Sequence, residues 1–179
     1  MIIHKEDKEK LNPKITDLRK GAVFLVNKPM EWTSFDVVNK LRKPLSKSYR
    51  QRRFKVGHAG TLDPLAEGLL IICVGSATKD ISDYMHLPKG YEGTITFGAT
   101  TPSYDKETEV DQTFDTSLLN LSIIKKAASK FVGNIEQKPP MYSAIKVKGT
   151  PLYKLARKGK TVERRPSSIN VYEFNINSY

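Results

Sequence analysis

Residues 56–68 hold the side chain of this chain that is best suited to chemistry. The segment carries one aspartate, Asp63, among three glycines and one proline, and the apolar run 69–74 follows it directly. Glycine and proline impose tight turns, and an apolar run is typical of a buried strand. A polar loop fixed against a buried strand holds a reactive group still. A carboxylate is ionised at neutral pH, so Asp63 could serve as a nucleophile.

Local residues alone leave other roles open for this segment. An aspartate before a proline is often a turn former or a helix N-cap, and Pro64 would suit the first position of a helix. His58 is either an ordinary hydrogen-bonding loop residue or a side chain that wedges between bases. Residues 57–60 have the weakly specific G-x-x-G form with which some RNA-binding domains clamp a backbone.

Other kinds of chemistry find little support in the sequence. It contains neither a Walker phosphate-binding motif nor the Gly-x-Ser-x-Gly turn of a serine hydrolase. The three histidines are far apart and there is one cysteine, so we expect no metal site. That cysteine, Cys73, lies in an apolar run, and we predict a core residue rather than a nucleophile.

The charge of the chain points to a polyanionic partner. Its 179 residues carry 30 Lys and Arg against 19 Asp and Glu, a formal charge of +11. Residues 40–55 hold eight of these cations and no acid, with Tyr49 and Phe54 interleaved, and a second basic block spans 146–165. Such blocks predict contacts with phosphates. A single cysteine and the lack of a membrane-length apolar run predict a cytoplasmic protein without a membrane partner.

The elements that must position these residues alternate irregularly between strand and helix, which favours an α+β fold with a mixed, mainly antiparallel sheet and helices packed on it. We predict a polar basic arm over 1–20 and one domain over 21–179. Thr33 and Ser34 are N-cap candidates for a helix that ends at Lys43, before Pro44. The other predicted elements are strands over 21–27, 69–74, 91–97, 141–147 and 168–179, helices over 76–87, 121–132 and 152–158, and a turn at Lys148 and Gly149.

Residues 57–70 resemble the signature motif of the TruB family of pseudouridine synthases, of bacterial type. The resemblance extends from about residue 21 to the end of the chain. The motif around the aspartate is long and highly specific, so it favours a catalytic Asp63 over a capping one. Further segments resemble family motifs: 25–29, 75–79, 89–91, 137–146 and 152–159.

The resemblance implies isomerisation of uridine to pseudouridine at position 55, in the T loop of tRNA. Asp63 would attack the flipped-out nucleoside, either at the sugar C1′ or on the uracil ring. Tyr91 would stack on the flipped base, and His58 would fill the gap left in the loop. Substrate binding by three lysines is also expected: Lys28, Lys79 and Lys146. No cofactor and no metal are expected, and we predict a monomer.

An alternative from a different class is a non-catalytic RNA-binding or RNA-folding module, and a third is a basic protein whose charge serves protein assembly.

The pattern also departs from the family. A later strand with an arginine that pairs with the catalytic aspartate is not found before Tyr179, nor is a C-terminal RNA-binding extension. We therefore expect a chain that is truncated at the C-terminus, binds RNA weakly and has little activity by itself.

Overall fold

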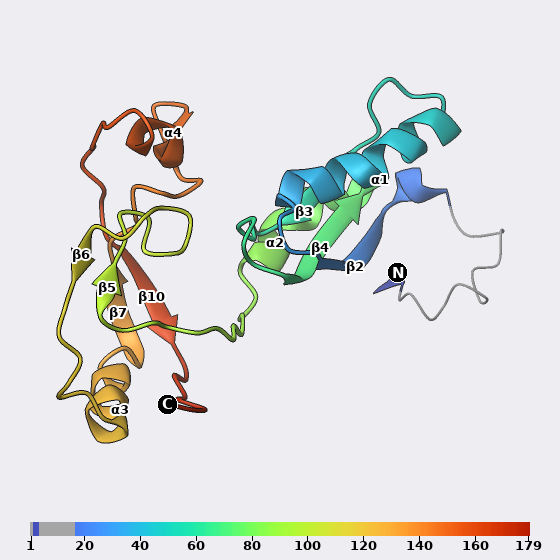
Figure 1. Cartoon of the computed structure of the whole chain (residues 1–179). Helices are drawn as coiled ribbons and strands as arrows, with labels where there is room; N and C mark the ends of the chain where they lie inside the picture. Colours follow the sequence, from blue (N-terminus) through green and yellow to red (C-terminus); the bar gives the residue numbers. More distant parts are fainter. Residues whose placement is uncertain (1, 4–16) are drawn as a thin grey trace. The chain divides into compact units, whose positions relative to one another are not determined.

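The computed structural model describes residues 2–3 and 17–179, which form two compact units, Met1–Glu92 and Gly93–Tyr179 (Figure 1). Each unit is described by itself. The domain predicted over 21–179 spans both. Most of the predicted arm over 1–20 lies outside the described residues, and its described part contains the strand β1 (Ile2–Ile3) and a 3-10 turn, Leu18–Lys20.

The first unit is built on a four-stranded sheet in the order β1-β2-β4-β3. Strand β2 (Ala22–Lys28) lies parallel to β1 and antiparallel to β4 (Gly68–Val74). Strand β3 (Val56–Ala59) is antiparallel to β4 on its other side. The sheet is therefore mixed and mainly antiparallel, and the predicted α+β class is confirmed.

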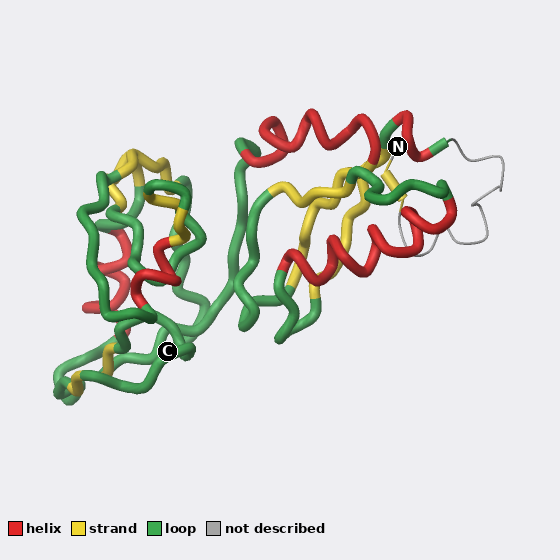
Figure 2. The backbone as a smooth tube through the Cα atoms, turned by 90° about the horizontal axis from the view of Figure 1, so that it is seen from above, coloured by secondary structure: helices red, strands yellow, loops and turns green. Residues whose placement is uncertain are grey.

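Helices cover both faces of this sheet, so that the strands lie between them when the unit is seen from above (Figure 2). Helix α1 (Ser34–Ser48) packs on one face, where Val38, Phe54 and Ile72 are among the buried residues. The 3-10 segment Gly75–Asp80 and α2 (Ile81–Met85) belong to the other face, where Cys73 is fully buried. Burial raises the pKa of the Cys73 thiol, which fits the core role predicted for it.

Helix α1 begins as predicted but ends later. Thr33 and Asp36 form a reciprocal capping box at its start. The predicted end at Lys43 is wrong, because α1 continues through Pro44 to Ser48. A proline removes only one helical N–H, and Leu41 and Leu45, on either side of Pro44, both pack against the core and hold the helix together. From α1 the Arg42 guanidinium also donates a hydrogen bond of 2.7 Å to the carbonyl oxygen of Val56, on β3.

The second unit has short strands and two helices. Its bounded elements are β5 (Ala99–Thr100), β6 (Gln112–Thr113), α3 (Leu121–Ser129), β7 (Gly133–Gln137), β8 (Lys146–Val147), β9 (Thr150–Pro151), α4 (Leu152–Ala156) and β10 (Ser167–Val171). Strands β7 and β10 pair antiparallel, and β8 and β9 form a hairpin. The predicted turn at Lys148 and Gly149 is confirmed, with the positive φ values of 49° and 81° that a tight hairpin turn needs.

Several predicted elements are shorter than expected or absent. Residues 91–97 form no strand, 141–147 are extended only at β8, and 168–179 only as far as Val171. The helix predicted over 76–87 is divided between a 3-10 segment and α2, and β7 was not predicted. Alternating side chains indicate a two-faced segment, but a strand forms only where a neighbour pairs with it. Within the described residues, no helix has the length and apolar character needed to cross a bilayer.

Candidate active site

Asp63 lies in the connection between β3 and β4, exposed at the surface of the first unit. Its carbonyl oxygen accepts a hydrogen bond of 3.0 Å from the N–H of Ala66, which closes a turn. No helix follows, because β4 begins at Gly68. Of the two local roles left open for Asp63, the structure therefore shows a turn and not a helix N-cap.

The residues on both sides of Asp63 are tied to the segment that precedes α1. The Ser34 hydroxyl donates to the carbonyl oxygen of Leu62 at 3.0 Å, and the Leu62 N–H donates to the same hydroxyl at 2.9 Å. The N–H of Glu31 donates to the carbonyl oxygen of Pro64 at 2.7 Å. Ser34 is almost fully buried, with 3% of its surface exposed. These hydrogen bonds fix the backbone immediately before and after the carboxylate.

Lys28, at the end of β2, stabilises the segment that leads to α1. Its side chain is fully buried, and its ammonium donates to the carbonyl oxygens of Pro29 at 2.9 Å and Trp32 at 2.7 Å. A buried ammonium is costly unless it is hydrogen-bonded, so these two contacts stabilise the 29–32 turn. This placement suits a residue that positions the loop, while the predicted contact of Lys28 with substrate stays a prediction.

We call the segment 28–34 the bracket, because it supports the turn 62–66. The bracket contacts backbone groups of the turn, at Leu62 and Pro64, and Asp63 between them is exposed. A carboxylate on a rigid turn loses little further freedom when it meets a substrate, which favours a defined direction of attack.

His58 lies on β3, directly opposite Ile72 of β4, and is half-buried. Its Nδ1 is in hydrogen-bond contact with the carbonyl oxygen of Gly60. A carbonyl only accepts, so Nδ1 carries the proton and the ring is oriented by the loop that leads to Asp63.

The remaining predicted site residues are exposed and lie further along the chain. Tyr91, with 79% of its surface exposed, is near the end of the first unit. Lys79 lies in the 3-10 segment after β4, and Lys146 begins β8 in the second unit. Their contacts with substrate remain predictions.

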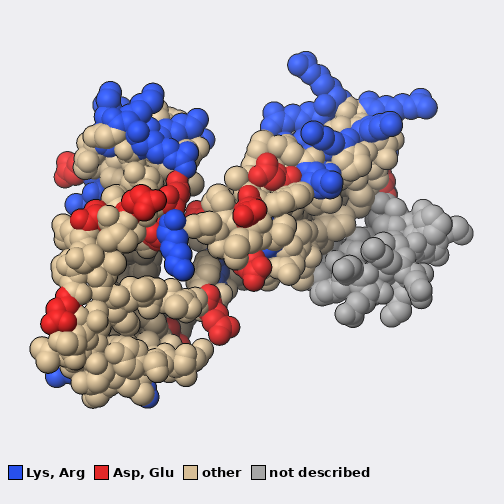
Figure 3. Space-filling view, viewed as in Figure 1, with Lys and Arg blue, Asp and Glu red and all other residues tan. Residues whose placement is uncertain are grey.

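Basic side chains gather over α1 and the loop that follows it (Figure 3). Seven of the eight cations in 40–55 are exposed; Arg42 is the half-buried exception. The interleaved aromatics serve the core instead, because Phe54 is buried and its ring lies 4.8 Å from that of Tyr49. In the part of the chain that the structure describes, no three His, Cys, Asp or Glu residues are grouped as metal ligands would be.

Sequence reasoning missed how the bracket acts. Ser34 and Leu62 are 28 residues apart, and the only local signal was the N-cap pattern of Thr33 and Ser34. Thr33 is the cap, which leaves the Ser34 hydroxyl available for the turn.

Comparison with known proteins gives one consistent family. The model of the "TruB family pseudouridylate synthase (N terminal domain)" matches residues 46–179. A tRNA pseudouridine synthase B of Flavobacterium johnsoniae is 50% identical over 157 residues, which cover 87% of this chain and 69% of the relative. Proteins of the same name from Phocaeicola vulgatus and Chloroherpeton thalassium are 44% and 48% identical, over 89% and 87% of this chain and 68% and 64% of theirs.

Proposed function

This chain belongs to the TruB family of pseudouridine synthases, and from this premise we propose that Asp63 attacks a uridine in the T loop of tRNA, at position 55. That the chain is an enzyme which forms pseudouridine in tRNA follows from the family and from the names of its relatives. The assignment of Asp63 is supported by one observation above all, the exposed carboxylate on a turn held from both sides by the bracket.

The proposed reaction rearranges one nucleoside without loss of atoms. The Asp63 carboxylate attacks either C1′ of the ribose or the uracil ring, and the bond between N1 and C1′ breaks. The uracil turns, C5 bonds to C1′, and the bond to Asp63 breaks, which frees the carboxylate. The proton on C5 leaves, and N1 gains a proton. Because no electrons are exchanged with a second molecule, the reaction needs no redox partner.

The substrate base must leave the folded T loop before Asp63 can reach it, at a cost of a few kcal/mol. We assign Tyr91 to stack on the flipped base and His58 to fill the gap that the base leaves. The exposed cations of 40–55, with Lys79 and Lys146, would contact phosphates and offset the cost of flipping.

The test compares wild type with Asp63→Asn, which keeps the size of the side chain but removes its charge. Unmodified tRNA is incubated with each protein, and pseudouridine is mapped by chemical derivatisation. We expect product at position 55 with wild type and none with Asp63→Asn, although both bind tRNA. Asp83→Asn, an equally conservative change at α2 of the same unit, is the matched control and should keep full activity.

Two results would contradict the assignment. Equal product from Asp63→Asn and wild type would remove Asp63 from the chemistry. Binding without product from either protein would favour the RNA-binding module.

We further propose that the enzyme acts in the cytoplasm as a monomer, and size-exclusion chromatography with light scattering tests its oligomeric state.

A further inference from the structure

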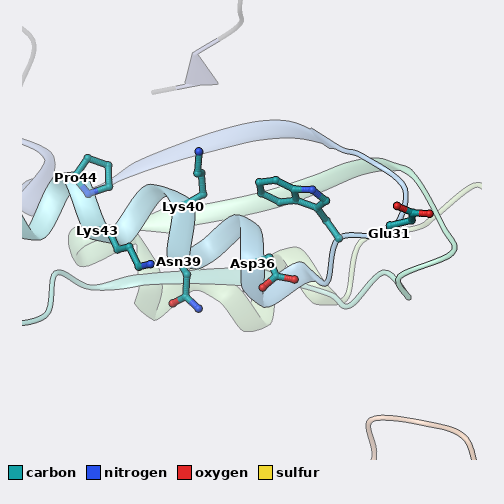
Figure 4. A pocket seen from close by; sticks show the side chains of 7 residues that line it. Glu31, Asp36, Asn39, Lys40, Lys43 and Pro44 are labelled. Atoms are coloured by element: carbon teal, nitrogen blue, oxygen red, sulfur yellow. The ribbon is translucent and has the colours of Figure 1, made fainter.

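A groove of about 740 Å³ runs along the outer side of α1, away from the sheet (Figure 4). Its walls come from the bracket and from the first three turns of the helix. Its lining includes Glu31, Trp32, Asp36, Asn39, Lys40 and Lys43. The proposed function counts Lys40 and Lys43 among the cations that contact phosphates, but it gives no role to the groove itself or to Trp32.

Trp32 gives the groove an aromatic surface. The residue is 37% exposed, whereas its carbonyl oxygen accepts a hydrogen bond from the buried Lys28 ammonium. The backbone of Trp32 is therefore fixed while part of its ring faces solvent. A partly exposed aromatic ring on a fixed backbone is the kind of platform on which single-stranded RNA-binding proteins stack a base.

The charges of the groove are divided along its length. Lys40 and Lys43 are exposed one helical turn apart. At the other end, Asp36 accepts hydrogen bonds from the N–H of Thr33 at 2.9 Å and from its hydroxyl at 2.5 Å. Glu31 adds a second, exposed carboxylate at that end, so the part of the groove that suits the phosphates of an incoming chain is the end with Lys40 and Lys43.

The groove also adjoins the turn that carries Asp63. Glu31 lines the groove, and its N–H is the group that donates to the carbonyl oxygen of Pro64, the residue after Asp63. The groove and the Asp63 turn therefore both border on Glu31.

We propose that this groove binds a segment of the tRNA substrate outside the flipped nucleotide, with one base stacked on Trp32 and its flanking phosphates on Lys40 and Lys43. This inference rests on the proposed function, because it takes the tRNA substrate as the occupant. Phosphates match the lysine end, and a stacked base matches the indole. The groove would thus hold the strand while the target uridine is at Asp63.

The chain offers a specific probe, since Trp32 is its only tryptophan. Asp63→Asn protein is titrated with unmodified tRNA and with an isolated T stem-loop hairpin while Trp32 fluorescence is recorded. We expect quenching that saturates together with binding measured by filter retention. Quenching by both RNAs places the T arm in the groove, and quenching by tRNA alone places another region of the tRNA there. Binding without any change in Trp32 emission would overturn the proposal.

Variants test the two halves of the groove separately. Lys40→Gln/Lys43→Gln should reduce the slope of log K against log salt by about 1.4, the value for two single-stranded phosphate contacts. Lys125→Gln/Lys126→Gln on α3 removes the same charge from another exposed helix and should leave the slope unchanged. Trp32→Ala should weaken binding by about 5- to 150-fold, and Trp32→Phe by much less.

The two proposals fail in different ways. If wild type forms pseudouridine at position 55 but the salt slope is the same for the Lys40→Gln/Lys43→Gln variant and its control, the groove is not a phosphate site and the proposed function stands. If wild type forms no pseudouridine there, the proposed function fails whatever Trp32 reports. Quenching by an acidic peptide as strong as that by RNA would also overturn the groove as an RNA site.

Discussion

Replacing Ser34 by alanine tests whether the bracket fixes the turn that carries Asp63. The change removes one hydroxyl from a buried position and leaves the Leu62 N–H and carbonyl oxygen without their partner. Nothing else in the turn is altered, and Thr33 still caps α1. The perturbation therefore acts on the backbone next to Asp63 and not on the carboxylate itself.

The magnitude follows from the two hydrogen bonds. Each contributes about 0.5–1.5 kcal/mol to stability, so Ser34→Ala should lower the free energy of unfolding by about 1–3 kcal/mol. The effect on rate is larger in proportion, because a misplacement of about 1 Å at a reacting group costs up to about 100-fold. We expect kcat to fall by about 10- to 100-fold, with little change in the affinity for tRNA.

The assay is single-turnover pseudouridine formation at saturating enzyme, at a temperature well below the unfolding midpoint of each variant. Ser46→Ala is the matched control. Ser46 is a half-buried serine of the same helix. Its hydroxyl accepts a hydrogen bond of 2.9 Å from the N–H of Phe54, away from the turn. The Ser46→Ala variant should be less stable than wild type but should form pseudouridine at the same single-turnover rate.

The reasoning is refuted if Ser34→Ala and Ser46→Ala show the same single-turnover rate. It is also refuted if the loss in Ser34→Ala is recovered at higher enzyme concentration, because that would place Ser34 in binding and not in positioning.

Three further changes probe the surroundings of the site. Lys28→Met should destabilise the fold by about 1–3 kcal/mol and slow the reaction, but keep the salt slope of tRNA binding. A slope reduced by about 0.7 would make Lys28 a phosphate ligand. Hydrogen bonds from Thr33 lower the pKa of Asp36 below its ordinary 3.8, so the carboxylate stabilises the fold fully at neutral pH and loses this effect as pH falls below 3.8. Asp36→Asn should therefore reduce the loss of thermal stability at acidic pH in a series of melts at different pH. The same loss in the variant and in wild type would contradict this. Gly75→Ala should cost at least about 1–3 kcal/mol in urea unfolding, because φ is +59° and the added Cβ would lie 2.0 Å from the carbonyl oxygen of Leu18, whereas Gly90→Ala meets open space and should be neutral.

The first unit was largely predictable because its signals are local and agree with its packing. Strands β2 and β4 are continuous apolar runs, and both lie inside a sheet covered on two faces. The start of α1 follows from the Thr33 cap. Its continuation through Pro44 was not predictable, since it depends on Leu45 packing against strands that are distant in sequence.

The second unit followed its local patterns less closely. Residues 91–97, which run from the end of the first unit into the second, alternate well, yet Tyr91 and Ile95 remain exposed and no strand forms there. Strand β7 has weaker alternation but pairs with β10 over five positions, from Gly133 opposite Val171 to Gln137 opposite Ser167. Pairing between segments about 30 residues apart decides these elements, and a local pattern carries no information about it.

For the site, the motif located the aspartate but not its support. Asp63 stands out by its glycine-rich setting, whereas Ser34 and Trp32 resemble ordinary residues at a helix start. The importance of Ser34 comes from its hydrogen bonds to Leu62, 28 residues further along the chain, and the backbone of Trp32 is held by the buried Lys28. Only the folded chain brings them together.

The hydrogen bond from Arg42 to Val56 has a consequence for solubility. In the described sheet β3 is an outer strand, and outer strands carry backbone groups that can recruit a strand from another molecule. By occupying the Val56 carbonyl oxygen, the guanidinium places a positive charge along this border, where a second copy of the chain would have to approach. We expect this charge to discourage aggregation, and it lies on the same helix whose Ser34 holds the turn of Asp63.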